Sequence, residues 1–276
     1  MSVKRQRLDQ LLVDQGFFPS RERAKAAVME GVVFLNGQRA AVKPGMAVDP
    51  EAALEVRGET LPWVSRGGLK LEKALNVFSF DPAGLICADL GASTGGFTDV
   101  LLTRGAAKVY AVDVGYGQLA WKLRNDPRVV NLERTNARYL TAEQIPEPLD
   151  LAVMDLAFIS IRLVLPAVHS LLREDGDVIC LVKPQFEAGR EKVGRNGVVR
   201  DKETHLEVLE RLLSEFPVLG FTPLGLDFSP IRGPEGNIEY LVRLKKGEKH
   251  PAPEFHYCDA AAVVAASHAE AGGKVK

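Results

Sequence analysis

The sequence predicts two structural classes in one chain. They are a doubly wound α/β domain with a mostly parallel sheet and, before it, a small basic domain that mixes helices and strands. From residue 85 onward, continuous apolar runs alternate with helical patterns, which is typical of a buried parallel sheet covered by helices. The first 43 residues carry more basic than acidic side chains, whereas the whole chain of 276 residues has a formal net charge of −1.

The composition excludes several other classes of protein. Hydrophobic residues make up 46% and charged residues 26%, so the chain is not broadly disordered. Its three cysteines show no CxxC spacing, and we expect neither a disulfide framework nor a metal site. Asp9 and Asp14 interrupt any secretory signal, and no apolar run is long enough to span a membrane. We therefore expect a cytoplasmic protein.

The first 60 residues are expected to fold separately. Leucines within residues 8–12 have helical spacing, and a second helix is expected to begin after Ser20 and to end at Gly31. Residues 32–35 are a predicted strand. Asn36-Gly37 then indicates a tight hairpin turn, because both residues tolerate left-handed backbone angles.

Basic residues gather near the second predicted helix, where Arg21 and Lys25 stand one turn apart. Such a cluster can neutralise phosphates along a nucleic acid, although a solvated helix face is the ordinary alternative. The order of residues resembles the small RNA-binding domain named after ribosomal protein S-four. The motifs that carry this resemblance are Arg7-Leu8-Asp9, Ser20-Arg21-Glu22-Arg23-Ala24, residues 31–37 and Lys43-Pro44-Gly45. The resemblance implies an RNA-binding surface, for which the candidates are Arg5, Arg7, Arg21, Arg23 and Lys25.

The α/β domain is expected to contain seven strands and four helices. The predicted strands are residues 85–90, 108–113, 129–132, 149–155, 177–183, 219–227 and 237–244, and the predicted helices are residues 97–104, 119–124, 161–172 and 202–216. The corresponding domain prediction is an RNA-binding domain over 1–60, a linker over 61–69, the α/β domain over 70–249 and a tail over 250–276. Within this tail, residues 260–266 are expected to be either a short helix or disordered.

A glycine-rich turn follows the first of these strands, at residues 89–97. Glycine lets the backbone turn sharply and approach a ligand closely. Ser93 stands where a dinucleotide-binding GxGxxG pattern requires glycine. The turn, with Asp113 after the next strand, is instead similar to the S-adenosylmethionine pocket of class I methyltransferases. A NAD site is the competing interpretation, since both share an acid about 20 residues further on. The residues expected to bind the cofactor are Asp89, Gly91, Ser93, Thr94, Gly95, Gly96, Phe97, Asp113, Asn136 and Ala137.

Charged residues also stand at the predicted strand ends. Asp155 and Lys183 each follow a buried strand, and Glu239 lies near the start of the last strand. That start reaches the same edge of the sheet if the strand is antiparallel, as it is in class I methyltransferases. Ligands of open α/β sheets bind at this edge. A solvated strand end would explain any one of these residues, but their joint placement favours a site.

The chain up to about residue 245 is similar to the TlyA family, sometimes labelled haemolysin A, of ribosomal RNA methyltransferases. The motifs that carry this similarity are residues 64–71, 89–98 and 182–187. The resemblance implies an FtsJ-type domain that methylates a ribose 2′-hydroxyl, usually of a cytidine, with ribosomal RNA or ribosomal subunits as partners. It also implies a Lys-Asp-Lys-Glu tetrad at Lys70, Asp155, Lys183 and Glu239.

The chemistry of these residue types fits that activity. A ribose hydroxyl must lose a proton to attack a methyl sulfonium, and a lysine can accept it if burial or a neighbouring cation disfavours its charge. We assign this role to Lys183, with Asp155 orienting it. The basic residues Arg66, Arg190 and Arg195 are further RNA-binding candidates. One alternative is a non-catalytic ribosome-assembly factor. The other is a haemolysin, and the lack of a strongly amphipathic cationic helix disfavours that second interpretation.

Overall fold

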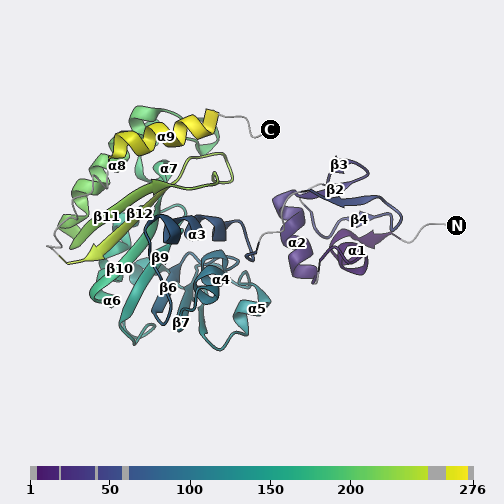
Figure 1. Ribbon diagram of the computed structural model, residues 1–276, viewed down its shortest axis with the longest axis horizontal. Helices are drawn as coiled ribbons and strands as arrows, with labels where there is room; N and C mark the ends of the chain where they lie inside the picture. The colour runs from purple at the N-terminus through teal and green to yellow at the C-terminus, as the bar shows by residue number, and fades with distance from the viewer. Residues whose placement is uncertain (1–4, 19, 41–42, 58–61, 248–258, 273–276) are drawn as a thin grey trace. The chain divides into compact units, whose positions relative to one another are not determined.

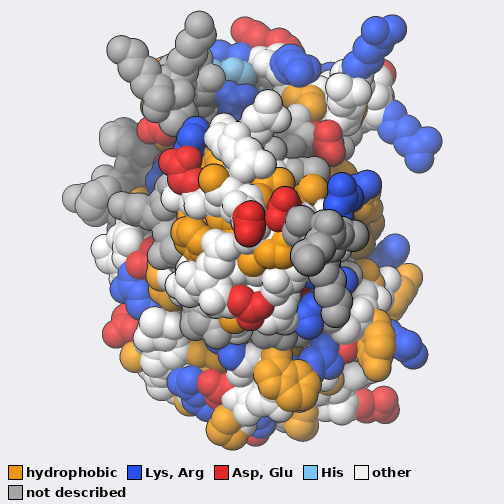
Figure 2. All heavy atoms as spheres, turned by 90° about the vertical axis from the view of Figure 1, so that its right-hand side faces the viewer, with side chains coloured by type: hydrophobic (Ala, Val, Ile, Leu, Met, Phe, Trp, Pro, Cys, Tyr) orange, Lys and Arg blue, Asp and Glu red, His pale blue; other side chains and the backbone are white. Residues whose placement is uncertain are grey.

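A computed structural model describes residues 5–18, 20–40, 43–57, 62–247 and 259–272. The chain divides into two compact units, Met1–Arg66 and Gly67–Lys276 (Figure 1). This division lies inside the segment 61–69 that the sequence analysis assigns to a linker. Lys and Arg side chains are interspersed with Asp and Glu on the face that Figure 2 shows, in keeping with the near-neutral net charge.

The N-terminal unit combines helices with short antiparallel strands. Strand β1 pairs with β4, and β2 lies between β3 and β5. The elements are β1 (Gln6–Arg7), α1 (Leu8–Asp14), α2 (Arg21–Glu30), β2 (Val33–Leu35), β3 (Gln38–Arg39), β4 (Ala47–Val48) and β5 (Leu54–Val56).

The helix caps and the hairpin turn predicted for this unit are present in the structure. The Ser20 hydroxyl accepts a hydrogen bond from the N–H of Arg23 at 3.3 Å and thereby caps α2. Gly31 ends the helix with a left-handed φ of +71°. Asn36 and Gly37 both have positive φ, +51° and +78°, and join β2 to β3. The predicted helix ends and hairpin are therefore confirmed.

A buried carboxylate holds the two helices of this unit together. Asp9 is fully buried, and its Oδ2 lies 2.9 Å from Arg7 Nη2 and 3.2 Å from Arg21 Nη2. The hydrogen bond from Arg7 is the largest of the effects that lower the pKa of Asp9 to about 2. The beginnings of α1 and α2 are thus tied through one ionised side chain.

The second unit is built on a seven-stranded sheet in the order β11-β12-β10-β9-β6-β7-β8. Strands β6 to β10 run parallel, and β12 is antiparallel to both of its neighbours, β10 and β11. The strands are β6 (Ile86–Leu90), β7 (Lys108–Val112), β8 (Val129–Leu132), β9 (Leu149–Met154), β10 (Leu172–Val182), β11 (Phe221–Phe228) and β12 (Tyr240–Lys246). The antiparallel direction expected for the last strand is confirmed.

Helices cover this sheet. Helices α3 and α4 contact each other, α3 also contacts β12, and α4 also contacts β6 and β7. The helices are α3 (Gly67–Val77), α4 (Gly96–Thr103), α5 (Trp121–Arg124), α6 (Leu165–Leu171), α7 (Pro184–Glu187), α8 (Lys202–Glu215) and α9 (Ala260–Gly272), with short 3-10 turns η1 (Ala137–Tyr139), η2 (Ile161–Leu163), η3 (Arg190–Lys192), η4 (Arg195–Gly197) and η5 (Pro217–Leu219).

Two segments differ from the sequence expectation. Helix α3 begins at Gly67, inside the predicted linker, because its apolar face packs on α4 and β12. The predicted tail contains α9, which packs on α8 and β11 and places Ala260 and Val264 in the core of the unit. The first part of that tail, residues 250–258, lies outside the described residues.

We expect Asp9→Asn to destabilise the N-terminal unit by about 1–3 kcal/mol, because the amide leaves two guanidinium groups without their buried anion. Since the pKa of Asp9 is lowered when folded, its stabilising effect is present above its ordinary pKa of 3.8 and is lost as the pH falls toward 2. Urea unfolding at pH 7 and at decreasing pH measures both effects. Asp14→Asn, an exposed acid at the end of α1, is the matched control. Equal stability of the two variants would contradict the assignment.

Candidate active site

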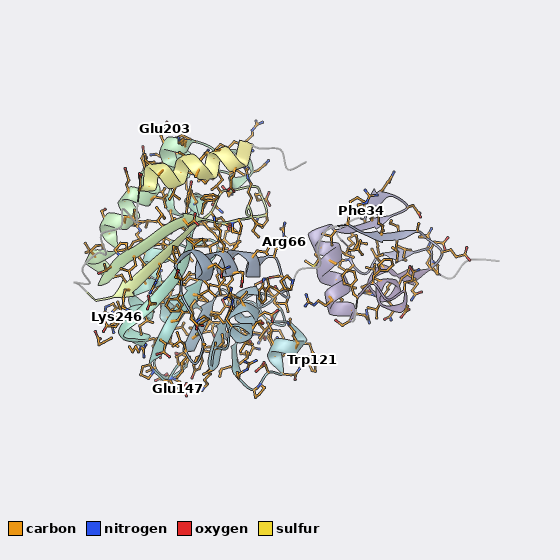
Figure 3. All side chains as sticks on the ribbon, in the orientation of Figure 1. Phe34, Arg66, Trp121, Glu147, Glu203 and Lys246 are labelled. Carbon is orange, nitrogen blue, oxygen red and sulfur yellow. The ribbon has the colours of Figure 1, made fainter. Side chains whose placement is uncertain are left out.

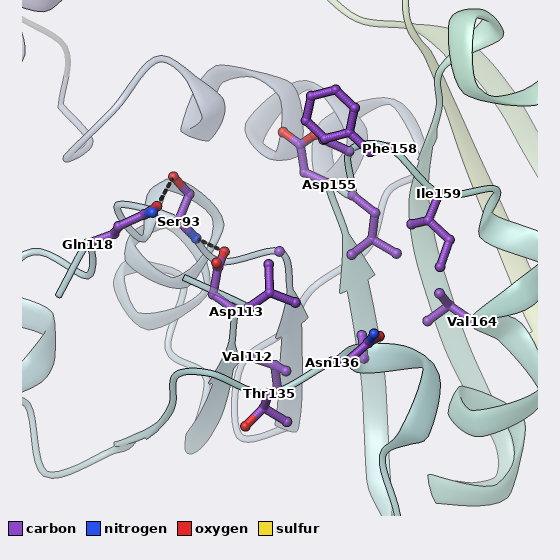
Figure 4. A pocket seen from close by; sticks show the side chains of 15 residues that line it. Ser93, Val112, Asp113, Gln118, Thr135, Asn136, Asp155, Phe158, Ile159 and Val164 are labelled. Atoms are coloured by element: carbon purple, nitrogen blue, oxygen red, sulfur yellow. Dashed lines mark hydrogen bonds between the residues drawn. The ribbon is translucent and has the colours of Figure 1, made fainter. Parts of the chain in front are cut away.

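The site lies where the chain order of the sheet reverses, between β6 and β9. From β6 the chain continues to β7 and β8 on one side, whereas β9 and β10 lie on the other. Open α/β sheets bind ligands in the crevice at such a point. A pocket of about 510 Å³ is found here (Figure 4), within the range of about 300–1,000 Å³ typical of small-molecule sites. It is lined by Gly91, Ser93, Val112, Asp113, Val114, Gln118, Thr135, Asn136, Ala137, residues 155–159 and Val164.

Gly91 lets two strand ends approach each other. Its φ is +89°, and a Cβ atom at this position would lie 2.6 Å from the carbonyl oxygen of Asp155. No side chain therefore fits between the turn after β6 and the end of β9. Gly91 also lines the pocket, and because it has no side chain a ligand can approach its backbone closely.

Asp113 presents a carboxylate to the pocket from the end of β7. Its Oδ2 accepts a hydrogen bond from the N–H of Ser93 at 2.8 Å, and its Oδ1 accepts one from the N–H of Gly115 at 2.7 Å. Figure 4 shows Asp113 and Ser93 together at one side of the pocket. Each carboxylate oxygen keeps acceptor capacity for a further donor, so this fixed group can hold the hydroxyls of a sugar.

The predicted cofactor residues separate into two groups. Gly91, Ser93, Asp113, Asn136 and Ala137 line the pocket, and the rest of the predicted set lies outside its lining. In that second group, Gly95 precedes α4 and Gly96 begins it, Thr94 belongs to the turn, and Phe97 is buried in the core.

Asp89 lies beneath the turn and is fully buried. One of its oxygens accepts hydrogen bonds from the N–H and the hydroxyl of Thr98, at 2.9 and 2.7 Å. Burial raises the pKa of Asp89 to about 7, because these neutral donors only partly offset the loss of water. The side chain thus ties β6 to the first turn of α4, on the far side of the glycine-rich turn in the sequence.

Four charged side chains meet beside the pocket, contributed by α3 and by the ends of three strands. Lys70 Nζ lies 3.1 Å from Asp155 Oδ2 and 2.6 Å from Glu239 Oε2. Lys183 Nζ lies 2.5 Å from Asp155 Oδ1. The charges therefore alternate along the row Glu239, Lys70, Asp155, Lys183, and Asp155 belongs both to this row and to the pocket lining. The structure brings the four predicted tetrad residues together.

The alternation compensates for burial. Burial by itself would lower the pKa of Lys70, but contacts with Asp155 and Glu239 raise it above its ordinary value. Burial likewise opposes ionisation of Asp155, but the ammonium groups of Lys70 and Lys183 lower its pKa. Both groups of this pair are therefore charged at neutral pH. Lys70 is held by two carboxylates, whereas the ion pair described for Lys183 is with Asp155.

Sequence reasoning missed most of the apolar wall of the pocket. Residues 156–159 and Val164 carry no pattern that marks them, because apolar side chains in a turn resemble ordinary packing. Phe158 is exceptional in being 91% exposed with a positive φ of +64°. A backbone angle of this kind is uncommon for an aromatic residue, and such angles cluster at functional sites.

The predicted RNA-binding residues have different surroundings. Arg5 and Lys25 are exposed, and Arg7 and Arg21 pair with Asp9. Arg23 donates to the carbonyls of Pro62 and Trp63, at 3.2 and 2.9 Å. Arg66 is exposed and directly precedes α3 (Figure 3). Arg190 and Arg195 are exposed in the 3-10 turns between α7 and α8.

The switch-point pocket, the glycine-rich turn and the seven-stranded sheet with an antiparallel β12 define a class I methyltransferase. The chain belongs to the FtsJ-like methyltransferase family, which matches residues 63–246, and an S4 domain matches residues 6–53. It also belongs with the TlyA proteins. The predicted family, fold class and type of N-terminal domain are confirmed.

Three relatives illustrate this membership. YqxC of Bacillus subtilis (strain 168) is 49% identical over 92% of this chain and 93% of that protein. The 16S/23S rRNA (cytidine-2'-O)-methyltransferase TlyA of Mycobacterium tuberculosis (strain ATCC 25618 / H37Rv) is 49% identical over 88% of this chain and 91% of that protein. A solved structure described as a hemolysin from Streptococcus thermophilus is 47% identical, with a TM-score of 0.76 and 98% of both chains covered.

Two further findings concern the described residues only. None of their helices is long and apolar enough to cross a membrane. They contain no group of three or more His, Cys, Asp or Glu side chains placed to hold a metal ion.

We expect Gly91→Ala to destabilise the second unit more than Gly84→Ala. Both glycines have positive φ, +89° and +75°, so each alanine costs about 1–2 kcal/mol of backbone strain. Only at position 91 does the new methyl group meet a backbone carbonyl, whereas position 84 has open space, and overpacking of this kind costs about 1–3 kcal/mol more. Urea unfolding of the two variants measures the difference. Equal losses would show that Gly91 is needed for its backbone angle alone.

Proposed function

We propose that this methyltransferase transfers a methyl group from S-adenosylmethionine to the ribose 2′-hydroxyl of a cytidine in ribosomal RNA. The observation that carries the proposal is the row of four alternating charges, which shares Asp155 with the pocket. The 49% identical TlyA protein of Mycobacterium tuberculosis is named for the 2'-O-methylation of cytidine in 16S and 23S rRNA, which supports the same substrate. Work on ribosomal RNA fits a site of action in the cytoplasm, with ribosomal RNA or ribosomal subunits as the partner.

The pocket residues fit S-adenosylmethionine. When bound, this cofactor supplies a methyl group on a positively charged sulfur. The fixed carboxylate of Asp113 would accept hydrogen bonds from its ribose hydroxyls. The close turn at Gly91 and Ser93 would accommodate its methionine part, and Asn136 and Ala137 would line the opposite wall. Asp89, Thr94, Gly95, Gly96 and Phe97 would support the turn.

Lys183 would first release its own proton to solvent, and its neutral Nζ would then accept the proton of the attacking hydroxyl. Lys70 is the poorer acceptor, because two carboxylates raise its pKa and keep its proton in place. Asp155 contacts both lysines and would orient Lys183 toward the substrate, while Glu239 would hold Lys70. Removing the hydroxyl proton as the oxygen attacks is general base catalysis. Alignment of the oxygen with the methyl group would supply much of the remaining acceleration.

RNA binding would rest on the S4 domain and on basic side chains of the second unit. The proposed contacts are Arg5, Arg7, Arg21, Arg23, Lys25, Arg66, Arg190 and Arg195. Asp9 would hold the guanidinium groups of Arg7 and Arg21 at the start of their helices, so that two of these cations are ordered before RNA arrives. Ordered cations lose less side-chain freedom on binding.

We expect Lys183→Ala to lower the methylation rate by about 10² to 10⁴, the usual contribution of a general base. Its affinity for S-adenosylmethionine should stay within twofold of wild type, because the lysine lies outside the pocket lining. Primer-extension mapping of 2′-O-methylation in ribosomal RNA gives the rate, and calorimetry gives the affinity.

Two controls accompany this variant. Lys73→Ala removes a lysine of α3 that pairs with Asp227 outside the row, and it should keep full activity. Asp113→Ala should weaken cofactor binding instead. Activity of Lys183→Ala within tenfold of wild type would move the proton acceptor elsewhere.

We expect the double variant Arg5→Ala, Lys25→Ala to weaken ribosomal RNA binding and its salt dependence. Each neutralised phosphate contributes about 0.7 to 0.9 to the slope of log K against log salt concentration, so the slope should flatten by about 1.5. Both side chains are exposed, so folding should be unaffected. The matched control is Arg128→Ala, Arg173→Ala, at the amino ends of parallel strands and thus opposite the pocket edge. An unchanged slope in the first variant would exclude this surface as an RNA contact.

A further inference from the structure

One wall of the pocket is a short segment that follows Asp155. This wall segment, residues 156–160, runs from the end of β9 to η2, and its first four residues line the pocket. Asp155 directly precedes the wall segment, and its N–H donates to the carbonyl of Leu90 in β6 at 3.1 Å. In the described structure, the N–H groups of the wall segment make no backbone hydrogen bond. Its last residue, Ser160, accepts a backbone bond from the N–H of Leu163 at 3.1 Å, so most of what holds the segment must come from side chains.

Glu187 supplies two hydrogen bonds at the far end of the wall segment. Its Oε2 accepts from the hydroxyl of Ser160 at 2.7 Å, and its Oε1 accepts from the N–H of Ile161 at 2.9 Å. The side chain is buried, with the residue only 6% exposed. Both carboxylate oxygens are thus used to fix the start of η2, immediately after the wall segment.

The same short helix that carries Glu187 begins directly after Lys183. Helix α7 spans Pro184–Glu187, and Lys183 is the residue that precedes it. Its Phe186 ring lies beside the largely exposed ring of Phe158 in the wall segment, with ring centroids 5.2 Å apart. Arg211 of α8 donates to the carbonyl of Glu187 at 2.7 Å and anchors the end of α7. The wall segment is therefore attached at two points to the chain that carries the proposed proton acceptor.

A carboxylate in this place has an energetic cost. Burial raises the pKa of Glu187 above its ordinary value, and hydrogen bonds from Ser160 and Ile161 offset this only in part. Because the folded-state pKa is raised, ionised Glu187 lowers stability as the pH rises through its pKa. Stability alone would therefore favour a neutral side chain. What the carboxylate contributes is two acceptors in one rigid plane, which fix the geometry of the segment.

We propose that Glu187 is a positioning residue for methyl transfer, which holds the cofactor wall at a fixed spacing from Lys183. It acts through the wall segment and through α7 and does not itself touch the cofactor or the substrate. This inference rests on the proposed function, because it assumes that the pocket holds S-adenosylmethionine and that Lys183 accepts the proton.

Three variants and one control test this role. Glu187→Ala should lower the affinity for S-adenosylmethionine at least tenfold and should also lower kcat, while the KM for RNA should remain within twofold because no basic RNA contact changes. Ser160→Ala, which removes one of the two Glu187 bonds together with the cap on the N–H of Arg162, should lower the cofactor affinity two- to fivefold. Glu187→Gln should restore affinity to within threefold of wild type. Its amide oxygen can accept from Ile161, and its amide N–H can donate to the Ser160 hydroxyl.

The control is Glu215→Ala, which breaks the ion pair of Glu215 with Arg162 at 3.0 Å. Glu215 itself does not contact Glu187, and its loss leaves the bonds of Arg162 to Ser160 and of Ser160 to Glu187 in place, so cofactor affinity and kcat should not change. Calorimetry with S-adenosylmethionine, carried out well below the melting temperature of each variant, measures the affinity of folded protein. A purely structural role would lower the melting temperature and leave this affinity unchanged.

Several outcomes would overturn the inference. They are wild-type cofactor affinity in Glu187→Ala, an equal loss in Glu215→Ala, or failure of Glu187→Gln to restore binding. If Glu187→Ala does not fold, wild-type affinity in Ser160→Ala overturns it as well. Failure of the proposed function looks different. In that case the wild-type protein binds S-adenosylmethionine but leaves ribosomal RNA unmethylated, and the effect of Glu187 on cofactor affinity is still measurable.

Discussion

The carboxylate of Asp155, held between two lysines, is the interaction on which the site depends. Its two oxygens lie 3.1 Å from Lys70 Nζ and 2.5 Å from Lys183 Nζ. Its N–H bonds to the end of β6, and its carbonyl lies so close to Gly91 that no side chain fits there. One residue thus sets the spacing of β6, β9, β10 and α3 at the edge of the sheet. The pocket and the charged row therefore share Asp155.

Alternation is what makes four charges tolerable in so buried a place. A buried ion without a partner costs several kcal/mol, whereas opposite charges in contact offset most of that penalty. Each lysine of the row contacts a carboxylate, and Asp155 is shared by both lysines. The sharing is unequal, since Lys70 takes two carboxylates. In the proposed mechanism, this inequality gives two chemically identical side chains different roles, with Lys70 as a fixed cation and Lys183 as the proton acceptor.

Much of this could be predicted from the sequence, because the signals are local. Continuous apolar strands, the cap at Ser20 and the turn at Asn36-Gly37 each depend on residues close together in the chain. Asp155, Lys183 and Glu239 were predictable because strand ends of an α/β sheet meet at one edge, whereas Lys70, on helix α3, was indicated only by the family resemblance. Residues 260–266 were left open between a short helix and a disordered stretch, because their alanine-rich sequence shows no clear apolar stripe and the buried face of α9 is defined only by contact with α8 and β11. Glu187 was missed for a related reason, since its partners lie 26 and 27 residues earlier in the chain.

Buried acids organise both units, and the sign of each pKa shift tells how. Asp9 and Asp155 each contact two cations, and both have a lowered pKa, so they stay ionised at neutral pH and hold those cations in place. Asp89 and Glu187 accept hydrogen bonds from neutral donors, and burial raises the pKa of both, to about 7 for Asp89. The first pair therefore fixes cations, and in the proposed function these would meet RNA phosphates and accept the hydroxyl proton. The second pair fixes backbone instead, because Asp89 accepts from the N–H of Thr98 in α4 and Glu187 accepts from the N–H of Ile161 at the start of η2. A lowered pKa thus marks the acids that order charged side chains, and a raised pKa marks the acids that hold backbone near the pocket.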